Sequence, residues 1–319
     1  MIRKVAVLTS GGDAPGMNAA VRAVIRAALA HNIEPYVIYD GYKGLIENRI
    51  VKVNKKFTQD IINRGGTIIC TARLPEFSQV EIQQRAIQNL KDKDIDALVG
   101  IGGDGTFRGL LGLSKLGFPV IGIPATIDND IASTDTTIGF DTALNTICDC
   151  VDKIKDTSSS HQRCSVIEVM GRHCGDLAIF SGIAEAAELT LTGDHKVDLE
   201  EIYAKLTYMK EHEKSHAIVI VSENLIDINE FGKKIQENTG FETKTEVLGR
   251  LQRGGTPTAA DRILASRLGA AAVELLANDI HGRVVGKKKN AVVDLPIKQA
   301  LAMERDIHKP LIHLIDLLA

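Results

Sequence analysis

Short apolar runs rich in Val and Ile alternate along the chain with longer segments of helical periodicity. The runs are continuous rather than interrupted by a polar residue at every second position, which is typical of parallel strands buried on both faces. In such folds ligands bind in loops beyond the carboxyl ends of the strands, and each run here adjoins a polar loop. We therefore predict an α/β fold with mainly parallel sheets, a helix over residues 19–30, and strands at residues 5–9, 97–101, 119–123, 165–169, 217–221 and 246–251.

Composition narrows the class of protein. The chain has 319 residues, 44% of them hydrophobic, which is enough for two domains or for one large α/β unit with a sizeable core. Its 38 Lys and Arg against 41 Asp and Glu give a net charge of −3, so there is no electrostatic case for nucleic acid or an anionic membrane. The apolar run at residues 5–8 is far shorter than the roughly 20 residues of a membrane span. We expect a cytoplasmic protein that binds neither nucleic acid nor membranes.

The cysteines indicate a reducing environment. They are five, an odd number, and they are scattered without the CxxC spacing of a zinc or redox site. We expect no disulfide framework and no zinc, but reduced thiols in or near the core: Cys70, Cys148, Cys150, Cys164 and Cys174.

Glycine-rich turns follow two of the predicted strands. Glycines stand at residues 11, 12 and 16 in the first strand-to-helix turn, and at residues 102, 103 and 105 in another. Glycine lets backbone N–H groups approach a phosphate closely, and the N-terminus of a following helix favours negative charge. The spacing matches neither a Rossmann fingerprint nor a Walker A loop. A phosphate site and simple tight turns are therefore both open at this point.

Carboxylates beyond the predicted strands favour phosphoryl transfer. Asp104 lies between glycines in GGDGT, and Asp128 and Asp130 lie in TIDND. Phosphoryl transfer requires Mg²⁺ to offset the phosphate charge and a carboxylate to orient or deprotonate the attacking hydroxyl. Turn formation and helix capping by Asp would explain one such loop well, but two less well. Five arginines in or beside the predicted strand-end loops suggest a polyanionic pair of substrates: Arg73, Arg163, Arg172, Arg250 and Arg253.

Eight motifs follow one another between residues 11 and 262: GGDAPGMNAA, TARLPEF, GGDGTF, TIDND, GFDTA, SSHQR, EVMGRHCGD and LQRGGTPTAADR. Together they resemble the bacterial ATP-dependent 6-phosphofructokinase family, and the resemblance is collinear from Met1 to about Gly286. The resemblance implies two Rossmann-like, doubly wound α/β domains with mainly parallel sheets. Residues 1–138 plus 251–300 would bind ATP and Mg²⁺, and residues 139–250 plus 301–319 would bind fructose 6-phosphate. It also implies a homotetramer whose active sites are completed by a neighbouring subunit.

The resemblance further implies an enzyme that phosphorylates fructose 6-phosphate, and it implies the site residues. Asp128 would be the base for the sugar's 1-hydroxyl, beside Thr126 and Asp130, and Arg172 would stabilise the transferring phosphoryl group. ATP would be held by Gly12, Tyr42, Arg73, Leu74, Gly103, Asp104, Gly105 and Thr106, with Asp104 on Mg²⁺. The sugar phosphate would contact Thr126, Ile127, Asp128, Met170, Gly171, Arg172 and Glu223, with its 6-phosphate on Arg250 and Arg253 of one subunit and on Arg163 and Lys244 of the next.

Four positions bear on which substrates are used. Pyrophosphate-dependent relatives typically carry Asp where Gly105 stands and Lys where Ala125 stands, so this chain favours ATP, although glycine is usual at position 125 in the ATP-dependent group. Lys244 stands where arginine is usual, and Arg250 where histidine is usual. We expect altered affinity for the sugar phosphate with the transfer chemistry intact. Two alternatives stay open: a pyrophosphate-dependent enzyme, and a catalytically weak paralogue that binds nucleotide and sugar phosphate.

An effector site for ADP or phosphoenolpyruvate is also implied by the resemblance, at Arg22, Arg26, Lys55, Lys155, Glu188, His212 and Lys214. Arg22 and Arg26 match the family and, four residues apart, share one face of a helix. Lys55, Lys155 and His212 stand where arginine is usual, and each loses its bidentate geometry. We therefore predict a weak or absent response to these effectors.

Overall fold

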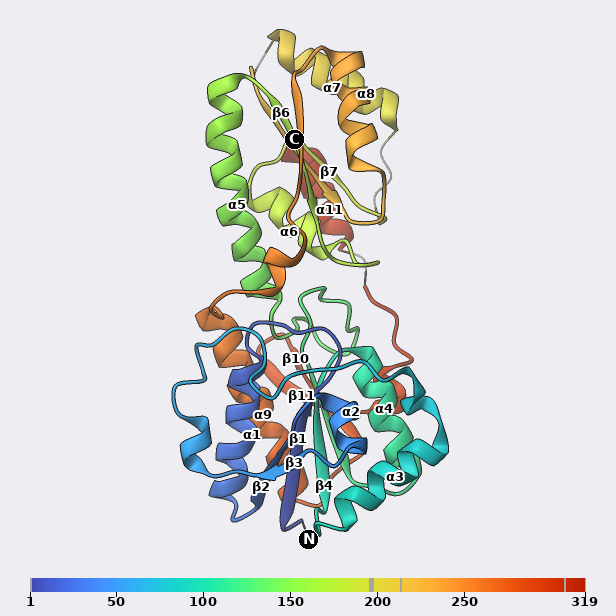
Figure 1. Cartoon of the computed structure of the whole chain (residues 1–319). Helices are drawn as coiled ribbons and strands as arrows, with labels where there is room; N and C mark the ends of the chain where they lie inside the picture. The colour runs from blue at the N-terminus through green and yellow to red at the C-terminus, as the bar shows by residue number, and fades with distance from the viewer. Residues whose placement is uncertain (1, 195–197, 213, 307, 319) are drawn as a thin grey trace. The chain divides into compact units, whose positions relative to one another are not determined.

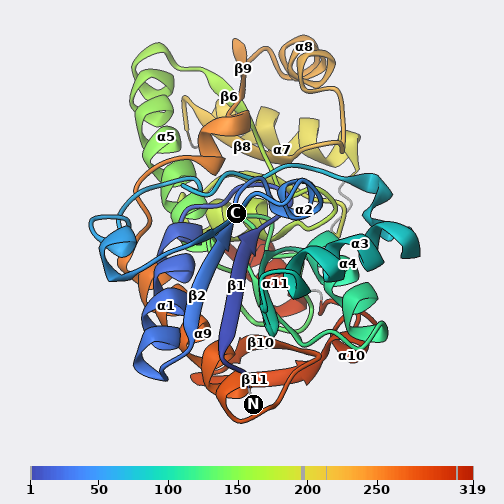
Figure 2. The same cartoon turned by 60° about the horizontal axis from the view of Figure 1, so that its bottom comes forward.

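The computed structural model describes residues 2–194, 198–212, 214–306 and 308–318. The chain divides into two compact units, each built around its own sheet (Figure 1, Figure 2). Unit 1 comprises Met1–Thr142 and Arg253–Arg305, and unit 2 comprises Ala143–Gln252 and Asp306–Ala319. The α/β class with mainly parallel sheets is confirmed.

Unit 1 contains a seven-stranded sheet in the order β11-β10-β5-β4-β1-β2-β3. The inner neighbours pair in parallel, while β3 and β11 lie antiparallel at the two edges. The strands are β1 (Lys4–Thr9), β2 (Glu34–Ile38), β3 (Ile50–Lys52), β4 (Ala97–Gly102), β5 (Val120–Pro124), β10 (Arg283–Lys288) and β11 (Ala291–Pro296).

Helices cover both faces of this sheet (Figure 1). On one face α1 (Met17–Ala30) packs beside α9 (Ala259–Ala277), and on the other lie α2 (Gly41–Ile46), α3 (Val80–Lys91), α4 (Asp104–Lys115) and α10 (Ile297–Ala300). Two short 3-10 turns, η1 (Lys55–Thr58) and η2 (Pro75–Ser78), lie in the connection from β3 to α3. Every residue of β4 and β5 is buried, which explains why these segments are continuous apolar runs.

The strand order of unit 1 reverses between β1 and β4. From β1 the chain proceeds to β2 on one side, and from β4 it proceeds to β5 on the other. In open α/β sheets ligands bind beyond the carboxyl ends of the strands at such a reversal. The two glycine-rich turns follow these two strands, so both lie at the reversal.

Unit 2 contains a four-stranded, wholly parallel sheet in the order β7-β8-β6-β9. The strands are β6 (Cys164–Val169), β7 (Leu189–Leu191), β8 (Ala217–Ser222) and β9 (Thr243–Val247). The helices are α5 (Phe140–His161), α6 (Asp176–Ala184), α7 (Leu199–His212), α8 (Ile228–Thr239) and α11 (Lys309–Leu318). The α7 and α8 helices bury one face of the sheet around Leu206, Val219 and Phe231, while α6 packs on β7 and β8, and α11 packs against α6.

Two expectations from the sequence are wrong. The strand predicted at residues 246–251 ends at Val247, and residues from Gly249 form a 3-10 helix, η3 (Gly249–Arg253). The apolar residues in this segment do not form a buried strand, because β9 is an edge strand and Val247 is 58% exposed. Cys70 is exposed, with φ of 58°, rather than in or near the core.

No helix in the described ranges combines the length and apolar character that crossing a membrane requires.

Candidate functional site

The two glycine-rich turns of unit 1 are joined by hydrogen bonds. The N–H of Ser10 donates to the carbonyl of Ile101 at 3.0 Å, and Oγ1 of Thr106 donates to the carbonyl of Ser10 at 3.0 Å. Gly103 is the N-cap of α4 and has no side chain with which to cap the first N–H groups of that helix. Because the N-terminus of a helix favours anions, this arrangement suits a phosphate group.

Tyr42 supports the turn formed by Gly103–Thr106. Tyr42 is 5% exposed, its ring stacks on Phe77 with centroids 3.9 Å apart, and its hydroxyl donates to the carbonyl of Thr106 at 2.6 Å. Burial raises the pKa of this hydroxyl well above its ordinary value. The side chain of Tyr42 therefore holds the Gly103–Thr106 turn in place. Of the other predicted ATP ligands nearby, Arg73 is exposed and Leu74 is partly buried against the core of unit 1.

Gly105 lies beside open space. A Cβ built at this position meets no atom within 4 Å in the part of the chain that the structure describes, and its φ lies outside the left-handed region. Glycine inside a helix costs roughly 1 kcal/mol relative to alanine. The packing of the chain thus gives no reason for glycine in the first turn of α4, and the space suits a bound group.

The loop after β5 carries Asp128, which is 1% exposed. Oγ1 of Thr126 accepts the N–H of Asp128 at 3.2 Å and lies 3.4 Å from its Oδ2. The N–H of Ala125 donates to the carbonyl of Gly102 at 3.0 Å, which ties this loop to the turn after β4. The structure therefore places Asp104 and Asp128 at the carboxyl ends of neighbouring parallel strands.

Asn129 and Thr137 fix the shape of this loop. Asn129 has φ of 53°, a left-handed conformation that Asn tolerates better than most residues, and its Oδ1 accepts the N–H of Thr137 at 3.0 Å. Oγ1 of Thr137 donates to the carbonyl of Thr126 at 2.7 Å. The sequence reasoning missed both residues, although Asn in TIDND was a visible signal for a left-handed turn. Ile127 is fully buried and Asp130 is partly exposed.

Asp104 is the candidate metal ligand of unit 1. Its carboxylate is 42% exposed and lies 3.9 Å from the guanidinium of Arg108. Among the described residues there is no group of three or more His, Cys, Asp or Glu that could hold a metal ion. Because Mg²⁺ typically binds one or two protein carboxylates and takes its other ligands from water and substrate phosphates, a single Asp104 suits it.

In unit 2 the loop after β6 is held by two side chains from later in the sequence. Oε1 of Glu223 accepts the N–H of Gly171 at 3.1 Å and that of Arg172 at 2.7 Å. Oε1 of Gln252, a fully buried residue, accepts the N–H of Met170 at 3.0 Å. The structure thus brings together Met170, Gly171, Arg172 and Glu223, as predicted, and adds Gln252, which the sequence reasoning missed.

This loop has an unusual backbone. Gly171 has φ of 140°, and a Cβ there would lie 2.4 Å from the carbonyl of Cys174, so only glycine fits. Arg172 has φ of 58°, a left-handed conformation that costs a non-glycine residue roughly 1–2 kcal/mol. Nearby, burial raises the pKa of Glu168, and the charges of Glu223 and Asp227 raise it further.

Arg163 and Lys244 lie at the amino ends of the strands of the same sheet, away from the loop after β6. Arg163 directly precedes β6, and Lys244 is the second residue of β9, which runs parallel to β6. The prediction that Arg163 adjoins the strand-end loops is therefore wrong, because it stands at the amino end of its strand. Six residues of strand separate it from Met170, which is about 20 Å. Arg163 and Lys244 share a partner in Glu242, at 2.9 Å and 3.2 Å.

The remaining two arginines belong to different units. Arg250 is exposed in the part of η3 that belongs to unit 2. Arg253 lies in unit 1, where its Nη1 donates to the carbonyl of Asp13 at 3.3 Å. A Cβ added to Gly12 would be 2.6 Å from that nitrogen, so Arg253 lies directly against the first glycine-rich turn.

The predicted effector residues are also divided between the units. In unit 1, Nε of Arg26 donates to Oγ1 of Thr58 at 2.5 Å, which brings the α1 helix against η1, where the exposed Lys55 lies. Arg22 lies one turn earlier on α1 and is partly exposed.

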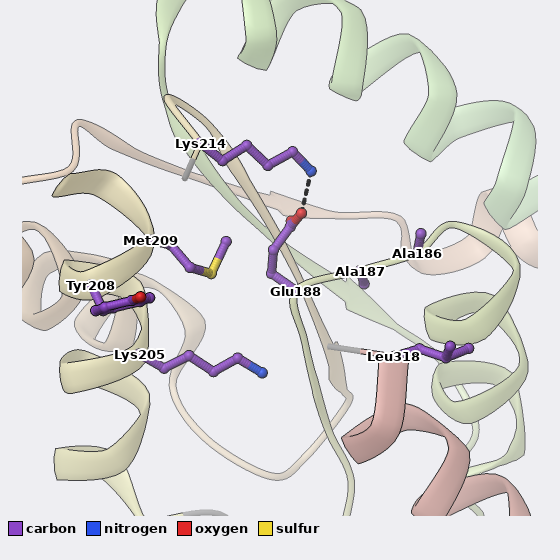
Figure 3. A pocket seen from close by; sticks show the side chains of 8 residues that line it. All are labelled: Ala186, Ala187, Glu188, Lys205, Tyr208, Met209, Lys214 and Leu318. Carbon is purple, nitrogen blue, oxygen red and sulfur yellow. Dashed lines mark hydrogen bonds and ion pairs between the residues drawn. The ribbon is translucent and has the colours of Figure 1, made fainter. Parts of the chain in front are cut away.

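In unit 2 the other effector candidates are paired with neighbouring groups. Lys155 contacts Oε2 of Glu185 at 3.1 Å, and Lys214 forms an ion pair with Glu188. Figure 3 shows this second pair at a cavity of about 300 Å³, with Lys205, Tyr208 and Met209 projecting from α7. His212 is not part of the cavity lining; its ring stacks on Tyr208 with centroids 4.6 Å apart.

Sequence comparison with known proteins points to one family. The sequence model of a family described as phosphofructokinase matches residues 4–276. The chain is 54% identical over 317 residues to an "ATP-dependent 6-phosphofructokinase" of Photobacterium profundum, with 99% of each chain covered. It is 53% identical over 313 residues to a protein of the same description from Bacillus licheniformis, with 98% of each covered.

Solved structures agree in fold. A phosphofructokinase of Saccharomyces cerevisiae superposes with a TM-score of 0.86 at 34% identity, covering 94% of this chain. This chain spans 45% of the length of that yeast chain. A pyrophosphate-dependent phosphofructokinase of Marinobacter aquaeolei superposes with a TM-score of 0.87 at 20% identity, covering 96% of this chain and 86% of that one, and at this identity it shows the fold alone.

Proposed function

The chain belongs to the phosphofructokinase family, and on that premise we propose that it transfers the terminal phosphoryl group of ATP to the 1-hydroxyl of fructose 6-phosphate. The products are fructose 1,6-bisphosphate and ADP, as in the committed step of glycolysis.

The observation that carries the proposal is the position of two carboxylates. Asp104 and Asp128 follow the neighbouring parallel strands β4 and β5, and both loops are hydrogen-bonded into the turn system at the reversal of strand order. One carboxylate is half-exposed beside a helix N-terminus, and the other is buried. This difference suits two roles, one toward a magnesium nucleotide and one toward the attacking hydroxyl.

In the reaction, Asp128 takes the proton of the 1-hydroxyl while the sugar oxygen attacks the terminal phosphorus of ATP and the bond to the ADP oxygen breaks. Thr126 orients Asp128 through its hydroxyl, and Asp130 lies beside them in the same loop. Arg172 neutralises the charge that develops on the transferring group, as Arg does in phosphoryl transfer generally. Asp104 would hold Mg²⁺, which offsets the charge of the ATP phosphates when bound.

The space beside Gly105 supports ATP as the phosphoryl donor, in agreement with the description of the similar proteins. The first turn of α4 leaves room for a nucleotide phosphate, and an Asp there would add a second negative charge next to Asp104. We therefore assign ATP rather than pyrophosphate as the donor. Gly12, Tyr42, Arg73, Leu74 and Gly103–Thr106 form the proposed ATP site.

The sugar-phosphate site uses Met170, Gly171 and Glu223 around Arg172, and Arg250 and Arg253 for the 6-phosphate. Arg163 stands about 20 Å along the sheet from Met170, and Lys244, which is in register with Ser165, stands about 17 Å from it. These distances support their use by the active site of a neighbouring subunit in a homotetramer. The effector residues would bind ADP or phosphoenolpyruvate, and we assign the protein to the cytoplasm.

The test is steady-state turnover of fructose 6-phosphate by the purified protein, with Mg-ATP and separately with Mg-pyrophosphate. We expect turnover with ATP and at least a hundredfold less with pyrophosphate, on the order of the loss that follows removal of a positioned charge interaction. Turnover with pyrophosphate alone would make the chain a pyrophosphate-dependent enzyme. Binding of both substrates without turnover would make it a catalytically weak paralogue.

A further inference from the structure

A carboxylate at the amino edge of the unit 2 sheet contacts two cations through one atom. Oε1 of Glu242 lies 2.9 Å from Nη2 of Arg163 and 3.2 Å from Nζ of Lys244. Glu242 directly precedes β9, and its backbone carbonyl accepts the N–H of Cys164 at 3.0 Å. The backbone therefore fixes Glu242 beside the residue that follows Arg163.

The side chains of Arg163, Glu242 and Lys244 differ in their exposure to solvent. Arg163 is 27% exposed, and its Nε is buried without a hydrogen bond to any residue in the described ranges, so its guanidinium meets solvent mainly at its outer end. The side chains of Glu242 and Lys244 are about half exposed. Hydrogen bonds to Lys244 and Arg163 lower the pKa of the Glu242 carboxyl. The carboxylate is thus ionised at neutral pH, and it can move more readily than the arginine that it contacts.

A phosphate group at Arg163 and Lys244 needs the same donors. Phosphate and carboxylate oxygens accept the same charge-assisted hydrogen bonds, and a phosphate brought against these cations would meet the negative charge of Glu242 at close range. Because both contacts of Glu242 use a single oxygen, the carboxylate lies between the two cations and stands where an anion bridging them would bind.

We propose that Glu242 competes with the 6-phosphate of the substrate for Arg163 and Lys244, so that the sugar phosphate binds by displacing a carboxylate. Glu242 is then a positioning residue that sets the Michaelis constant for fructose 6-phosphate and leaves the chemistry at Asp128 unchanged. This inference rests on the proposed function and on the assignment of Arg163 to the 6-phosphate.

The experiment compares Glu242→Gln with Glu246→Gln in the full-length enzyme. Gln keeps an amide oxygen of similar shape and removes only the charge. Glu246 offers a matched control, because it is an exposed acid in β9, paired with Ile167 and four residues, or about 13 Å, from Glu242. Exposed ion pairs contribute up to about 1 kcal/mol, so we expect KM for fructose 6-phosphate to fall roughly two- to fivefold in Glu242→Gln, with kcat within twofold of wild type.

Other results would overturn the inference in distinguishable ways. A KM for fructose 6-phosphate that rises, or that matches the Glu246→Gln control, would show that Glu242 does not compete for the cations. Arg163→Ala should raise this KM at least tenfold, on the scale of a lost charge-assisted contact. An unchanged KM in Arg163→Ala, with wild-type turnover intact, would remove the 6-phosphate assignment while the proposed function stands. Absence of wild-type turnover would overturn the function itself, and this inference with it.

Discussion

Glu223 holds the backbone of Arg172 in a left-handed conformation: Oε1 of the glutamate accepts the N–H of the arginine at 2.7 Å and that of Gly171 at 3.1 Å. A left-handed backbone conformation at Arg172 raises the free energy of the folded state unless other contacts stabilise it. The carboxylate of Glu223, directly after β8, provides such contacts. The direction in which Arg172 projects is therefore determined by a residue 51 positions away in the sequence.

Removing this carboxylate should destabilise unit 2 and weaken substrate binding. Glu223→Ala leaves two backbone N–H groups without their acceptor, and we expect the free energy of unfolding to fall by about 1.5–3 kcal/mol. The KM for fructose 6-phosphate should rise, since the loop no longer presents Arg172 in one orientation. Urea unfolding and steady-state kinetics measure the two effects.

Two comparisons make this prediction specific. Glu223→Gln should show a smaller loss, because its amide oxygen can still accept both N–H groups. Glu230→Ala removes an exposed i,i+4 pair with Lys234 on α8 and should cost no more than about 0.5 kcal/mol. Equal losses in Glu223→Ala and Glu230→Ala would show that Glu223 does not support the loop.

Asp128→Asn should abolish most of the turnover without disturbing the fold. The side chain is 1% exposed, and Asn has the same shape and can keep the contact with Thr126 but cannot take a proton. We expect kcat to fall by about 10²–10⁴, the usual contribution of a general base. ATP binding and the thermal unfolding midpoint should stay close to wild type, and a loss of less than tenfold in kcat would remove Asp128 from the role of base.

Gly105→Asp should weaken ATP binding while the protein stays folded. The position is open to solvent or ligand, so the side chain meets no steric obstacle, but its charge lies next to that of Asp104. We expect KM for ATP to rise by about tenfold or more, which corresponds to roughly 1.4 kcal/mol. Gly105→Ala is the uncharged control and should raise helix stability by up to about 1 kcal/mol. If both variants bind ATP equally, charge at this position does not select the donor.

Stability should fall at alkaline pH because of Cys164. Burial, with the charge of Glu188 adding to it, raises the pKa of this thiol from 9.0 to about 12. At a pH between these two pKa values, the thiol is ionised in the unfolded chain and protonated in the folded protein, so unfolding releases a proton. The free energy of unfolding should therefore decrease by up to roughly 1.4 kcal/mol for each pH unit in this window.

Cys164→Ala tests this dependence. The variant should be less stable at pH 7, since it loses a buried side chain, but its stability should fall less steeply above pH 9 than that of the wild type. Urea unfolding at several pH values between 7 and 11 gives the slopes. Cys70→Ala, at an exposed thiol, should keep the wild-type slope. Identical slopes in all three proteins would assign the alkaline loss to other groups.

The sequence predicted best what depends on burial over several consecutive residues. β4 and β5 are buried along their whole length, so their apolar runs stand out, and a loop after a fully buried parallel strand must lie at the carboxyl edge. This reasoning placed Asp104 and Asp128 at one edge without any three-dimensional information.

Two kinds of feature could not be predicted in this way. The position of Arg163 depends on which end of β6 it adjoins, and nearness to a strand in the sequence does not distinguish the two ends. Gln252 and Asn129 act through hydrogen bonds to distant or irregular backbone, and an amide in a loop carries no pattern that identifies its partner. The contact from Gln252 to Met170 spans 82 positions.

The order of the segments has a consequence for synthesis on the ribosome. Unit 1 needs α9 to cover α1 and β10 to pair with β5, and both are encoded after residue 252. At about 5–20 residues per second, translation of residues 143–252 takes roughly 5–20 s. During that interval the nascent first segment exposes the apolar side of α1 and an open strand edge at β5, while the main segment of unit 2 emerges uninterrupted. Aggregation of the growing chain is therefore most favoured while unit 2 is being made.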